Sequence, residues 1–517
     1  MNAIFWGGVQ RFAEALTEAA PTLLVGLVIA SIFRRLIGPE GTRRLFGAGT
    51  RSALPRAWAI GMLLPVCSLG VIPIARELRR VGLSGGTILA FALTAPLFNP
   101  LSVLYGLSLS EPVVIFSFAL ASLGVVTAVG IAFDRVFPEN ATTEPPPAPV
   151  SYGPKRMVAL LVAAARELAG PTTGYILIGL LGVVLLNAAL PMGSLGHRME
   201  RDNPTAALEM TLVALPAYAT PMIAMAQLGS MFQHGNSVAA AFVLLTFGAG
   251  ANLGLLAWIA RSYGAMRSAS WLGGLLVMVL GLAYAMDRPL TPRGIEPAGH
   301  THAFDIYCCP FQPGGGGPAV VGKELAEEVM PHEIKALGVL LGIGLLGLAL
   351  NRLDRRWRIE DWLERAPDPS GARRPRSRFD VTIPGPVLGG VGLLGLIAFS
   401  VLACYTYYPP AEQILDDLTI IKTEVLSAAN SGGADHAEYF IPLYQDWVRR
   451  LQVSVYLREG TLSPYRRMKA RVLIDKVERL KHAVEEDDPK EVRRHVIAVT
   501  DAHRRMRSSF VAMPKPQ

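Results

Sequence analysis

Long apolar runs, separated by short polar loops, fill most of residues 1–408. A helix that crosses the ~30 Å hydrocarbon core needs about 20 mainly apolar residues, because every backbone polar group must be satisfied inside the helix. About eight runs meet this requirement: residues 22–36, 87–107, 112–133, 172–190, 238–259, 270–286, 334–350 and 384–403. The pattern predicts an all-α polytopic membrane protein.

Two further apolar stretches, residues 54–76 and 205–228, are interrupted by proline and glycine. Basic residues mark the cytoplasmic ends of spans, and the loop after the first run is rich in arginine. If residues 54–76 crossed fully, the basic end at Arg76, Arg79 and Arg80 would lie outside. A helical hairpin that enters and leaves from the cytoplasmic side avoids this conflict. The second stretch then becomes a hairpin from outside, and both chain ends are expected outside.

With this topology the two halves share the order span, broken hairpin, span, span, in opposite orientations. Pro65 and Pro216 open the hairpin breaks, and Asn99 and Asn252 lie deep in the spans that follow. Inverted halves with discontinuous segments indicate a secondary transporter with a substrate site near the midplane, since unwound backbone is tolerated there only beside a cavity. The alternative is that proline and glycine merely kink ordinary spans.

The predicted organisation has six parts. They are a first permease repeat (1–140), a cytoplasmic linker (141–170), a second, inverted repeat (171–287), a periplasmic loop rich in His and Cys (288–333), two additional transmembrane helices with a basic cytoplasmic loop (334–408), and a periplasmic helical bundle (409–517). We expect the first span to be retained rather than cleaved as a signal peptide, because it continues into Arg34 and Arg35 without a cleavage site.

Composition supports the membrane prediction. Hydrophobic residues make up 51% of the chain and charged residues 17%, below the soluble norm of about 25%. Four cysteines cannot staple a small disulfide scaffold. The net charge of +8 does not indicate a nucleic-acid partner, because the arginines cluster beside apolar runs. The phosphate-binding pattern G-x-x-x-x-G-K-[ST] is absent, and the sequence leaves the energy source open.

Residues 409–517 change to a charged, amphipathic pattern that predicts four helices at 411–429, 434–458, 464–485 and 489–510. Short loops favour an up-down four-helix bundle outside the membrane. Its outline resembles periplasmic four-helix cytochromes, but C-x-x-C-H is missing and no cofactor is expected. His436, His495 and His503 are expected on the surface, and the bundle is a candidate docking site for a periplasmic protein.

The first hairpin reads Leu-Pro-Val-Cys-Ser-Leu-Gly-Val-Ile-Pro over residues 64–73, followed by a Leu-Arg-Arg patch and a span with Asn99-Pro100. Over about residues 15–285 the chain resembles the predicted permeases of the organoarsenical-efflux type, whose hallmark is a Pro-x-Cys-Ser-Cys-Gly-x-x-Pro turn with an Asn-Pro pair. Leu69 stands where that family has its second Cys. The resemblance implies that Cys67 contacts the substrate as a single thiol, which is a weaker ligand for soft ions than a pair.

Nine residues are the predicted lining of the substrate pathway: Cys67, Ser68, Gly70, Pro73, Asn99, Pro100, Pro216, Thr220 and Asn252. Glycine and proline open the backbone, while the thiol and the amides supply polar contacts. Tyr218 and Gln227 are neutral neighbours, so the cavity suits an uncharged or weakly charged solute. The alternatives are that Cys67 is a small buried hydrophobe and that the asparagines only join helices.

Two further hypotheses concern ionisable residues. Proton coupling usually needs an intramembrane carboxylate, for which Glu77 and Glu209 are the candidates, although Glu77 is expected in a surface ion pair with a neighbouring arginine. The loop 288–333 carries candidate ligands for a thiophilic metal, which match no standard zinc spacing and could equally be structural. With Cys67 as a further candidate metal ligand, they are His300, His302, Cys308 and Cys309.

The sequence therefore predicts a permease of the bacterial inner membrane, and not an enzyme. It would export a small, thiophilic metal ion or metalloid compound by alternating access, with the lipid bilayer and the solute as its partners. One alternative is a membrane-anchored sensor or assembly factor whose bundle is the functional module. A weaker alternative is a membrane redox enzyme.

Overall fold

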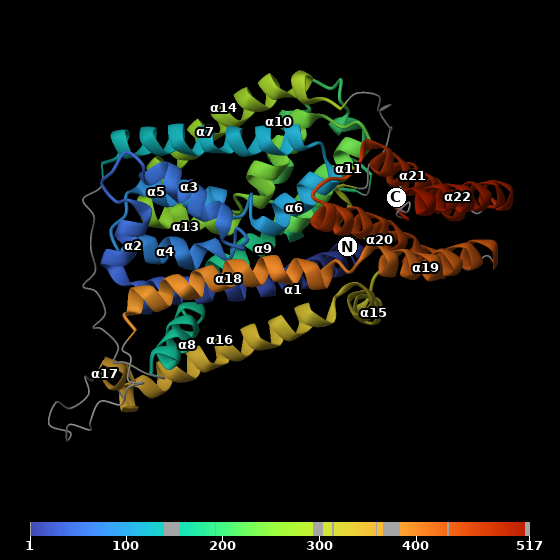
Figure 1. Ribbon diagram of the computed structural model, residues 1–517. Coiled ribbons are helices and arrows are strands. Elements are labelled where there is room, and N and C mark those ends of the chain that lie inside the picture. The colour runs from blue at the N-terminus through green and yellow to red at the C-terminus, as the bar shows by residue number, and fades with distance from the viewer. Residues whose placement is uncertain are drawn as a thin grey trace, which may run out of the picture. The chain divides into compact units, whose positions relative to one another are not determined.

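The computed structural model describes residues 2–138, 155–191, 193–292, 303–312, 315–357, 359–364, 383–431, 434–486 and 488–511. Over these residues the regular structure is helical, without a β-strand. The chain divides into two compact units (Figure 1). The first comprises Met1–Val103 and Val113–Phe399, and the second comprises Leu104–Pro112 and Ser400–Gln517.

The first repeat runs from α1 to α7. Its elements are α1 (Asn2–Ile32), η1 (Phe33–Ile37), α2 (Gly38–Phe46), α3 (Ala53–Leu63), α4 (Val71–Arg80), α5 (Gly85–Thr94), α6 (Pro100–Leu109) and α7 (Pro112–Val136). The first predicted span, 22–36, is part of a longer helix, because α1 is continuous through Pro21. Its polar residues contact protein neighbours: Arg11, for example, donates to the Cys308 carbonyl at 3.1 Å.

The second repeat is preceded by an amphipathic helix in the predicted linker. The elements are α8 (Lys155–Leu168), α9 (Pro171–Ala189), η2 (His197–Met199), α10 (Ala206–Ala214), α11 (Pro221–Gln233), α12 (Val238–Val243), η3 (Leu244–Ala249), α13 (Leu253–Tyr263) and α14 (Ala265–Leu290). The elements that follow are η4 (Asp305–Tyr307), α15 (Pro318–Glu328), α16 (Pro331–Trp357), α17 (Ile359–Glu364) and α18 (Gly385–Tyr407). The last residues of α18, from Ser400, belong to the second unit.

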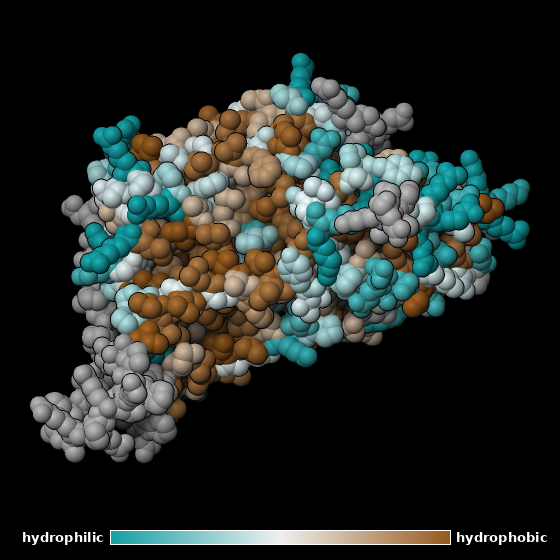
Figure 2. Space-filling view, in the orientation of Figure 1, coloured by the Kyte–Doolittle hydropathy of each residue, from teal (hydrophilic) through white to brown (hydrophobic). Residues whose placement is uncertain are grey.

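Within the described residues, six helices are long and apolar enough to cross a membrane: Asn2–Phe46, Pro112–Val136, Pro171–Ala189, Ala265–Leu290, Pro331–Leu353 and Gly385–Tyr407. Many of their large apolar side chains are exposed, as at Leu120, Val277 and Leu394. Figure 2 shows a broad apolar surface, drawn in brown, over the helices of the first unit. Such a surface is suited to lipid, and the fold is that of a polytopic membrane protein.

Both stretches predicted as broken hairpins are broken, as the pairs α3–α4 and α10–α11. The spans that follow them are broken as well, although the sequence analysis treated each as a single helix. The run 87–107 is interrupted between α5 and α6, and the run 238–259 bends by 62° between η3 and α13. The physical reason is local: Pro100 cannot donate a backbone hydrogen bond and disfavours helical geometry at Asn99.

The two repeats share a hydrogen bond between an aspartate and a backbone amide at corresponding positions. In the first, Asp134 at the end of α7 accepts a hydrogen bond from the Gly86 amide at 2.6 Å. In the second, Asp287 near the end of α14 accepts one from the Ala239 amide at 2.7 Å. The sequence separation of Asp134 and Asp287 equals that of Asn99 and Asn252. Equal spacing of equivalent contacts supports the internal repeat.

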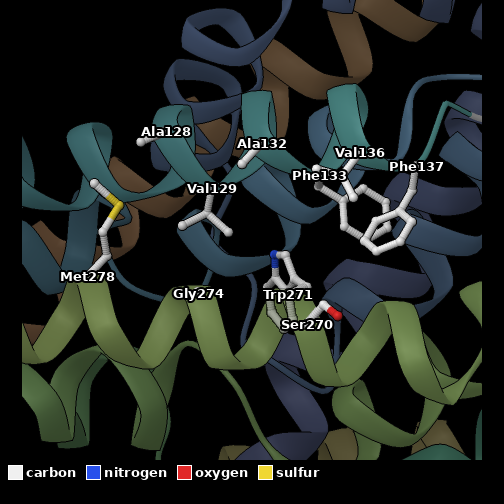
Figure 3. Close-up of a pocket in the computed structure, with 10 residues that line it drawn as sticks. All are labelled: Ala128, Val129, Ala132, Phe133, Val136, Phe137, Ser270, Trp271, Gly274 and Met278. Carbon is white, nitrogen blue, oxygen red and sulfur yellow. The ribbon is translucent and has the colours of Figure 1, made fainter.

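The repeats run in opposite directions, as α7 and α14 illustrate. These helices lie side by side, with Ala128 of α7 near Met278 of α14 at one end and Phe137 near Ser270 at the other (Figure 3). Increasing residue number on one helix therefore meets decreasing number on the other. Because α7 and α14 are the corresponding final helices of the two repeats, their antiparallel arrangement is the one expected of inverted halves.

The second unit contains the bundle α19 (Ala411–Ser431), α20 (Ala434–Glu459), α21 (Pro464–Glu485) and α22 (Pro489–Phe510). Consecutive helices pack together and α22 closes against α19. The four predicted helices are confirmed almost to the residue. Leu418, Tyr444, Val477 and Val499 are fully buried in the core they share. His503 is also buried, hydrogen-bonded to the Tyr444 hydroxyl at 2.6 Å, so its predicted surface position is wrong.

Candidate substrate pathway at the helix breaks

In each broken span, a polar side chain caps the helix that begins after the break. Asn99 Oδ1 accepts a hydrogen bond from the Ser102 amide at 2.8 Å at the start of α6. Asn252 Oδ1 accepts one from the Leu255 amide at 2.9 Å at the start of α13. Both asparagines are almost fully buried. Each therefore satisfies one free amide at a helix start deep inside the protein.

In each hairpin, too, the second helix begins beside a side chain that accepts a backbone hydrogen bond. In the second hairpin, Thr220 Oγ1 accepts a hydrogen bond from the Ile223 amide at 3.4 Å at the start of α11. In the first hairpin, Cys67 Sγ accepts one from the Gly70 amide at 3.3 Å, just before α4. The four breaks thus present four helix N-termini, whose partial positive charge favours electron-rich groups.

The tip of the first hairpin packs against the middle of α1. A Cβ on Gly70 would lie 2.8 Å from the Thr22 carbonyl oxygen, and a Cβ on Gly26 would collide with the Gly70 carbonyl. Larger residues would therefore separate the tip from the helix. This explains why glycine is needed at both positions.

The tip of the second hairpin packs in the same way against α9. A Cβ on Gly182 would collide with the Pro216 carbonyl oxygen. One turn earlier on α9, a Cβ on Gly179 would meet both Leu69 of the first hairpin and Asn252 of the second repeat, the latter at 2.8 Å. Parts of both repeats therefore meet on this face of α9.

The hairpin tips also meet each other. The Tyr218 hydroxyl, in the second break, is a close neighbour of the Cys67 thiol and the Thr22 hydroxyl. The two broken spans approach as well, because a Cβ on Gly250 would lie 2.9 Å from Leu97 Cδ2. The structure thus brings the breaks of opposite repeats together in the interior of the first unit.

Three buried polar atoms at these breaks make no well-aligned hydrogen bond to the described part of the protein: Ser68 Oγ, Tyr218 Oη and Asn252 Nδ2. Their side chains are at most 3% exposed. A buried polar group without a partner costs roughly 1–3 kcal/mol, so its persistence in one region needs an explanation. A solute that offers oxygen lone pairs or hydroxyl groups would satisfy these atoms.

The remaining predicted pathway residues are prolines, which shape the backbone at the breaks and offer no polar side chain. Pro73 is buried in the first turn of α4, and Pro100 is the first residue of α6, where its missing N–H costs nothing. Pro216 is half-buried at the second tip. The sequence analysis missed Gly26, Gly179 and Gly182, although the Gly-x-x-Gly spacing on α9 signals one helix face that admits close contact.

Behind the first hairpin lies a group of buried ion pairs, which we call the charge cluster: Arg76, Glu77, Arg80 and Glu167. Glu167, near the end of α8, pairs with Arg76 at 2.7 Å and lies 3.9 Å from Arg80. Glu77 pairs with Arg80 at 3.1 Å; Glu77 itself is buried, at 6% exposed, whereas the Arg80 side chain is 27% exposed. The cluster fastens α4 to α8. Glu167 was missed because residues 141–170 were expected to be a linker.

The other predicted coupling carboxylate, Glu209, lies elsewhere. It pairs with Arg198 at 3.3 Å, and its side chain is 30% exposed. Glu209 lies on α10, the first helix of the second hairpin, and its ion pair is open to solvent, as a surface ion pair would be.

A short segment, residues 303–308, is buried against the first unit. Gln227 Nε2 donates to the Ala303 carbonyl at 2.9 Å, and the Tyr307 hydroxyl donates to Gln227 Oε1 at 3.3 Å. Arg11 donates to the carbonyls of Asp305 and Cys308. Phe304, Tyr307 and Cys308 are at most 1% exposed. The segment covers the helix faces that carry Arg11 and Gln227.

The predicted metal ligands of this loop receive little support. His300 and His302 lie outside the described residues, and the described residues contain no group of three or more His, Cys, Asp or Glu side chains that could hold a metal ion. Burial raises the pKa of the Cys308 thiol to about 11, with a further contribution from Asp305. At neutral pH Cys308 is a protonated thiol, which is a poor metal ligand.

An apolar groove between α7 and α14, of about 390 Å³, lies away from the breaks (Figure 3). Val129, Trp271 and Met278 point into it from the two helices. It lacks convergent polar groups, apart from Ser270 at one end. The groove suits a hydrocarbon chain of the surrounding lipid and offers little to a polar solute.

Broken helices in two inverted repeats, with capped N-termini and unsatisfied polar atoms where the breaks meet, are typical of a multi-pass membrane transporter. A family model described as "Predicted permease" matches residues 6–287, more than half of the chain. The protein belongs to this permease family. The match also confirms the family predicted from the Cys67 turn and the Asn99-Pro100 pair.

The chain is also similar to the UPF0718 protein YcgR of Bacillus subtilis (strain 168), with 30% identity over 138 residues. The aligned part covers 26% of this chain and 46% of that protein, so the chain spans about half the length of this curated relative. No solved structure matches the chain.

Proposed function

We propose that this permease exports a small, uncharged or weakly acidic, thiophilic solute, such as the hydroxide of a trivalent metalloid, by alternating access at the meeting point of the four breaks. The observation that carries the proposal is that three buried polar atoms without a well-aligned hydrogen bond in the described protein lie at the breaks, and that one of them, the Tyr218 hydroxyl, neighbours the Cys67 thiol. Oxygen atoms of the solute would engage Ser68, Tyr218 and Asn252, and its soft atom would engage Cys67. One thiol binds a soft centre weakly enough to release it.

The charge of the site supports a neutral solute over a free divalent cation. Helix N-termini and amide or hydroxyl donors stabilise electron-rich groups and repel cations. The tips at Cys67 and Tyr218 carry no carboxylate of their own. A hydroxylated metalloid compound has both the soft atom and the oxygens that this arrangement can bind.

The proposed setting is the bacterial inner membrane, with the bundle α19–α22 in the periplasm. The basic loops Arg34–Arg56 and Arg352–Arg378 would then face the cytoplasm, in agreement with the positive-inside rule. A surface rich in charged residues suits the bundle to docking a periplasmic protein. Cysteine labelling from either side of the membrane, at Arg79→Cys and at Lys481→Cys, tests this orientation.

The transport proposal predicts that Cys67→Ala lowers protection against thiophilic solutes. The test is a sensitivity panel of arsenite, antimonite, phenylarsine oxide, copper and zinc, in a host lacking its own exporters, followed by efflux from vesicles. Losing one soft contact worth about 1.4 kcal/mol should lower efflux of the transported compound about tenfold. Cys404→Ala is the matched control, because that thiol only bonds the Ser400 carbonyl within α18 at 3.3 Å.

Two results would contradict the proposal. One is wild-type efflux of every protected solute by the triple variant Cys67→Ala, Asn99→Ala and Asn252→Ala. The other is loss of protection on deleting residues 409–517 while the remaining chain still inserts and carries out no transport in vesicles. The second result would favour the alternative that the bundle is the functional module of a sensor or assembly factor.

A further inference from the structure

The apolar groove between α7 and α14 stays open because small residues face it from both helices. Ala128 and Ala132 line it from α7, and Gly274 lines it from α14 (Figure 3). A Cβ at Gly274 would meet nothing within 4 Å. The Trp271 ring borders the space, and this residue is only 5% exposed. With about 390 Å³, the groove falls within the range of ligand sites, roughly 300–1,000 Å³.

The surroundings of the groove match the hydrocarbon core of a bilayer. Both α7 and α14 are long and apolar enough to cross a membrane. Val136 lines the groove and is 66% exposed, and Val277, beside the lining residue Met278, is 75% exposed. Large exposed apolar side chains on such helices face lipid. The occupant that fits an apolar groove in this position is therefore an acyl chain.

The end of the groove at Phe137 is aromatic and basic. The Arg267 guanidinium lies over the Phe137 ring, 5.7 Å from its centroid. The rings of Phe137 and Phe133 are 5.4 Å apart, and those of Phe133 and Tyr263 are 5.5 Å apart. Arg79 in turn lies over the Tyr263 ring at 4.6 Å. Aromatic rings thus hold two arginines from different helices at this end.

Positive charge exceeds negative charge where α7, α13 and α14 meet at this end. Arg135 lies two positions before Phe137, Arg261 lies two positions before Tyr263, and both arginines are exposed. Among the described residues, the acid at these helix ends is Asp134, which already accepts a hydrogen bond from a backbone amide of α5 at 2.6 Å. The charge of this end is complementary to a phosphate group.

We propose that the groove binds an anionic phospholipid, with an acyl chain between Ala132 and Gly274 and the headgroup phosphate beside Arg267. Arg79, Arg135 and Arg261 supply the surrounding positive charge. Basic pockets between spanning helices on the cytoplasmic side are typical sites for anionic headgroups, and the proposed orientation places this end there. The lipid contacts the final helix of each repeat and so joins the two repeats. This inference does not depend on the identity of the transported solute.

The first test asks whether an acyl chain enters the groove. Full-length protein is reconstituted in vesicles of phosphatidylglycerol with brominated acyl chains, which quench tryptophan on contact. The signal of Trp271 is the difference between wild type and Trp271→Phe. We expect strong quenching, which Gly274→Leu relieves because its side chain fills the groove without a clash. Gly273→Leu is the matched control, since a Cβ there also meets nothing within 4 Å and Gly273 does not line the groove.

The second test asks whether the headgroup matters. Unlabelled phosphatidylglycerol or phosphatidylcholine competes with brominated phosphatidylcholine for the Trp271 signal. Each arginine near an anionic lipid contributes about fivefold in affinity. We therefore expect a preference for phosphatidylglycerol of about fivefold or more, which Arg267→Gln lowers about fivefold and which high salt weakens.

Arg201→Gln is the charge-matched control for Arg267→Gln. Arg201 is exposed on a loop that contacts the far part of α14, where the Tyr284 hydroxyl donates to the Pro204 carbonyl at 2.7 Å. Tyr284 is about 21 Å along the helix axis from Ser270, at the other end of the groove. We expect Arg201→Gln to leave the lipid preference unchanged.

Three outcomes would overturn the proposal. Trp271 fluorescence that brominated lipid does not quench would show that no chain enters, and a dimer in native mass spectrometry would then identify a second copy as the occupant. Equal competition by the two lipids would show a groove that accepts any lipid. A preference that Arg267→Gln leaves intact would reject the headgroup site. If Gly274→Leu does not fold, Ala132→Leu fills the groove from α7 and replaces it in the first test.

Discussion

At the scale of single residues, the most consequential positions are those where backbone meets backbone. Gly26 on α1 and Gly182 on α9 each face a carbonyl at a hairpin tip, Gly70 in one repeat and Pro216 in the other. Neither glycine has a positive φ, so their role is close approach and not turn geometry. The sequence could flag Asn99 and Cys67 as unusual in apolar surroundings. It could not identify the partners of these glycines, because close contact depends on which segment lies opposite.

This argument predicts different results for two glycines of the same helix. Gly182→Ala should destabilise the protein by about 1–3 kcal/mol, because its Cβ forces the second tip away from α9. Gly174→Ala, where a Cβ meets nothing within 4 Å, should change stability by less than about 0.5 kcal/mol. Thermal unfolding of the purified variants in detergent measures the difference. Equal effects would show that the tip is not held by close contact.

At the scale of elements, apolar periodicity predicted where helices lie but not every place where they break. The Pro and Gly content of residues 54–76 and 205–228 revealed the hairpins. The break at Gly250 carries no proline in its immediate neighbourhood, and only the cap formed by Asn252 marks it. Helix α8 escaped prediction for a different reason. Its apolar face packs on α1 and α16 and its Glu167 binds α4, and such partners cannot be known from a local pattern.

The charge cluster gives a prediction for this element. Glu167→Gln should destabilise the first unit by about 1–3 kcal/mol, because Arg76 would remain mostly buried, with 19% of its side chain exposed, and without its counter-charge. Glu40→Gln is the control, since its pair with Arg44 at 3.7 Å is 85–90% exposed. Thermal unfolding at low and high salt compares the two. A control that loses as much stability as Glu167→Gln would refute the argument.

At the scale of the whole molecule, the change from apolar to charged composition correctly indicated a separate helical part after the last span. The bundle helices were predicted nearly to the residue because four strong amphipathic patterns were separated by short breaks. Assignment of Leu104–Pro112 to the same compact unit could not be foreseen. It depends on contacts such as that between the rings of Tyr105 and Tyr408, 6.3 Å apart, which join residues distant in sequence.

The buried histidine of the bundle predicts acid sensitivity. Burial, aided by Lys422 and Arg507, lowers the pKa of His503 from its ordinary 6.5 to about 4. The neutral form is thus favoured in the folded state, so stability is complete above about pH 6.5 and falls as the pH drops toward 4, by roughly 1–3 kcal/mol. Hydrogen exchange of α20 and α22 peptides in the full-length protein measures this loss.

His503→Gln should flatten that pH dependence, even if it lowers stability at all pH values through the lost contact with Tyr444. His495→Gln serves as the comparison, because His495 pairs with Glu491 at 3.4 Å on the outside of the same helix. An unchanged acid response in His503→Gln would show that another group of the bundle is responsible.

The two hairpin tips show which features of a duplicated unit can differ between its two copies. Both tips begin their second helix at a side chain that accepts a hydrogen bond from the backbone, but the acceptor is sulfur at Cys67 and oxygen at Thr220. The geometry that both tips share is what the architecture demands, whereas the chemical element of the acceptor atom is free to differ between them. Within one chain, each tip is therefore the reference against which the specialisation of the other can be judged.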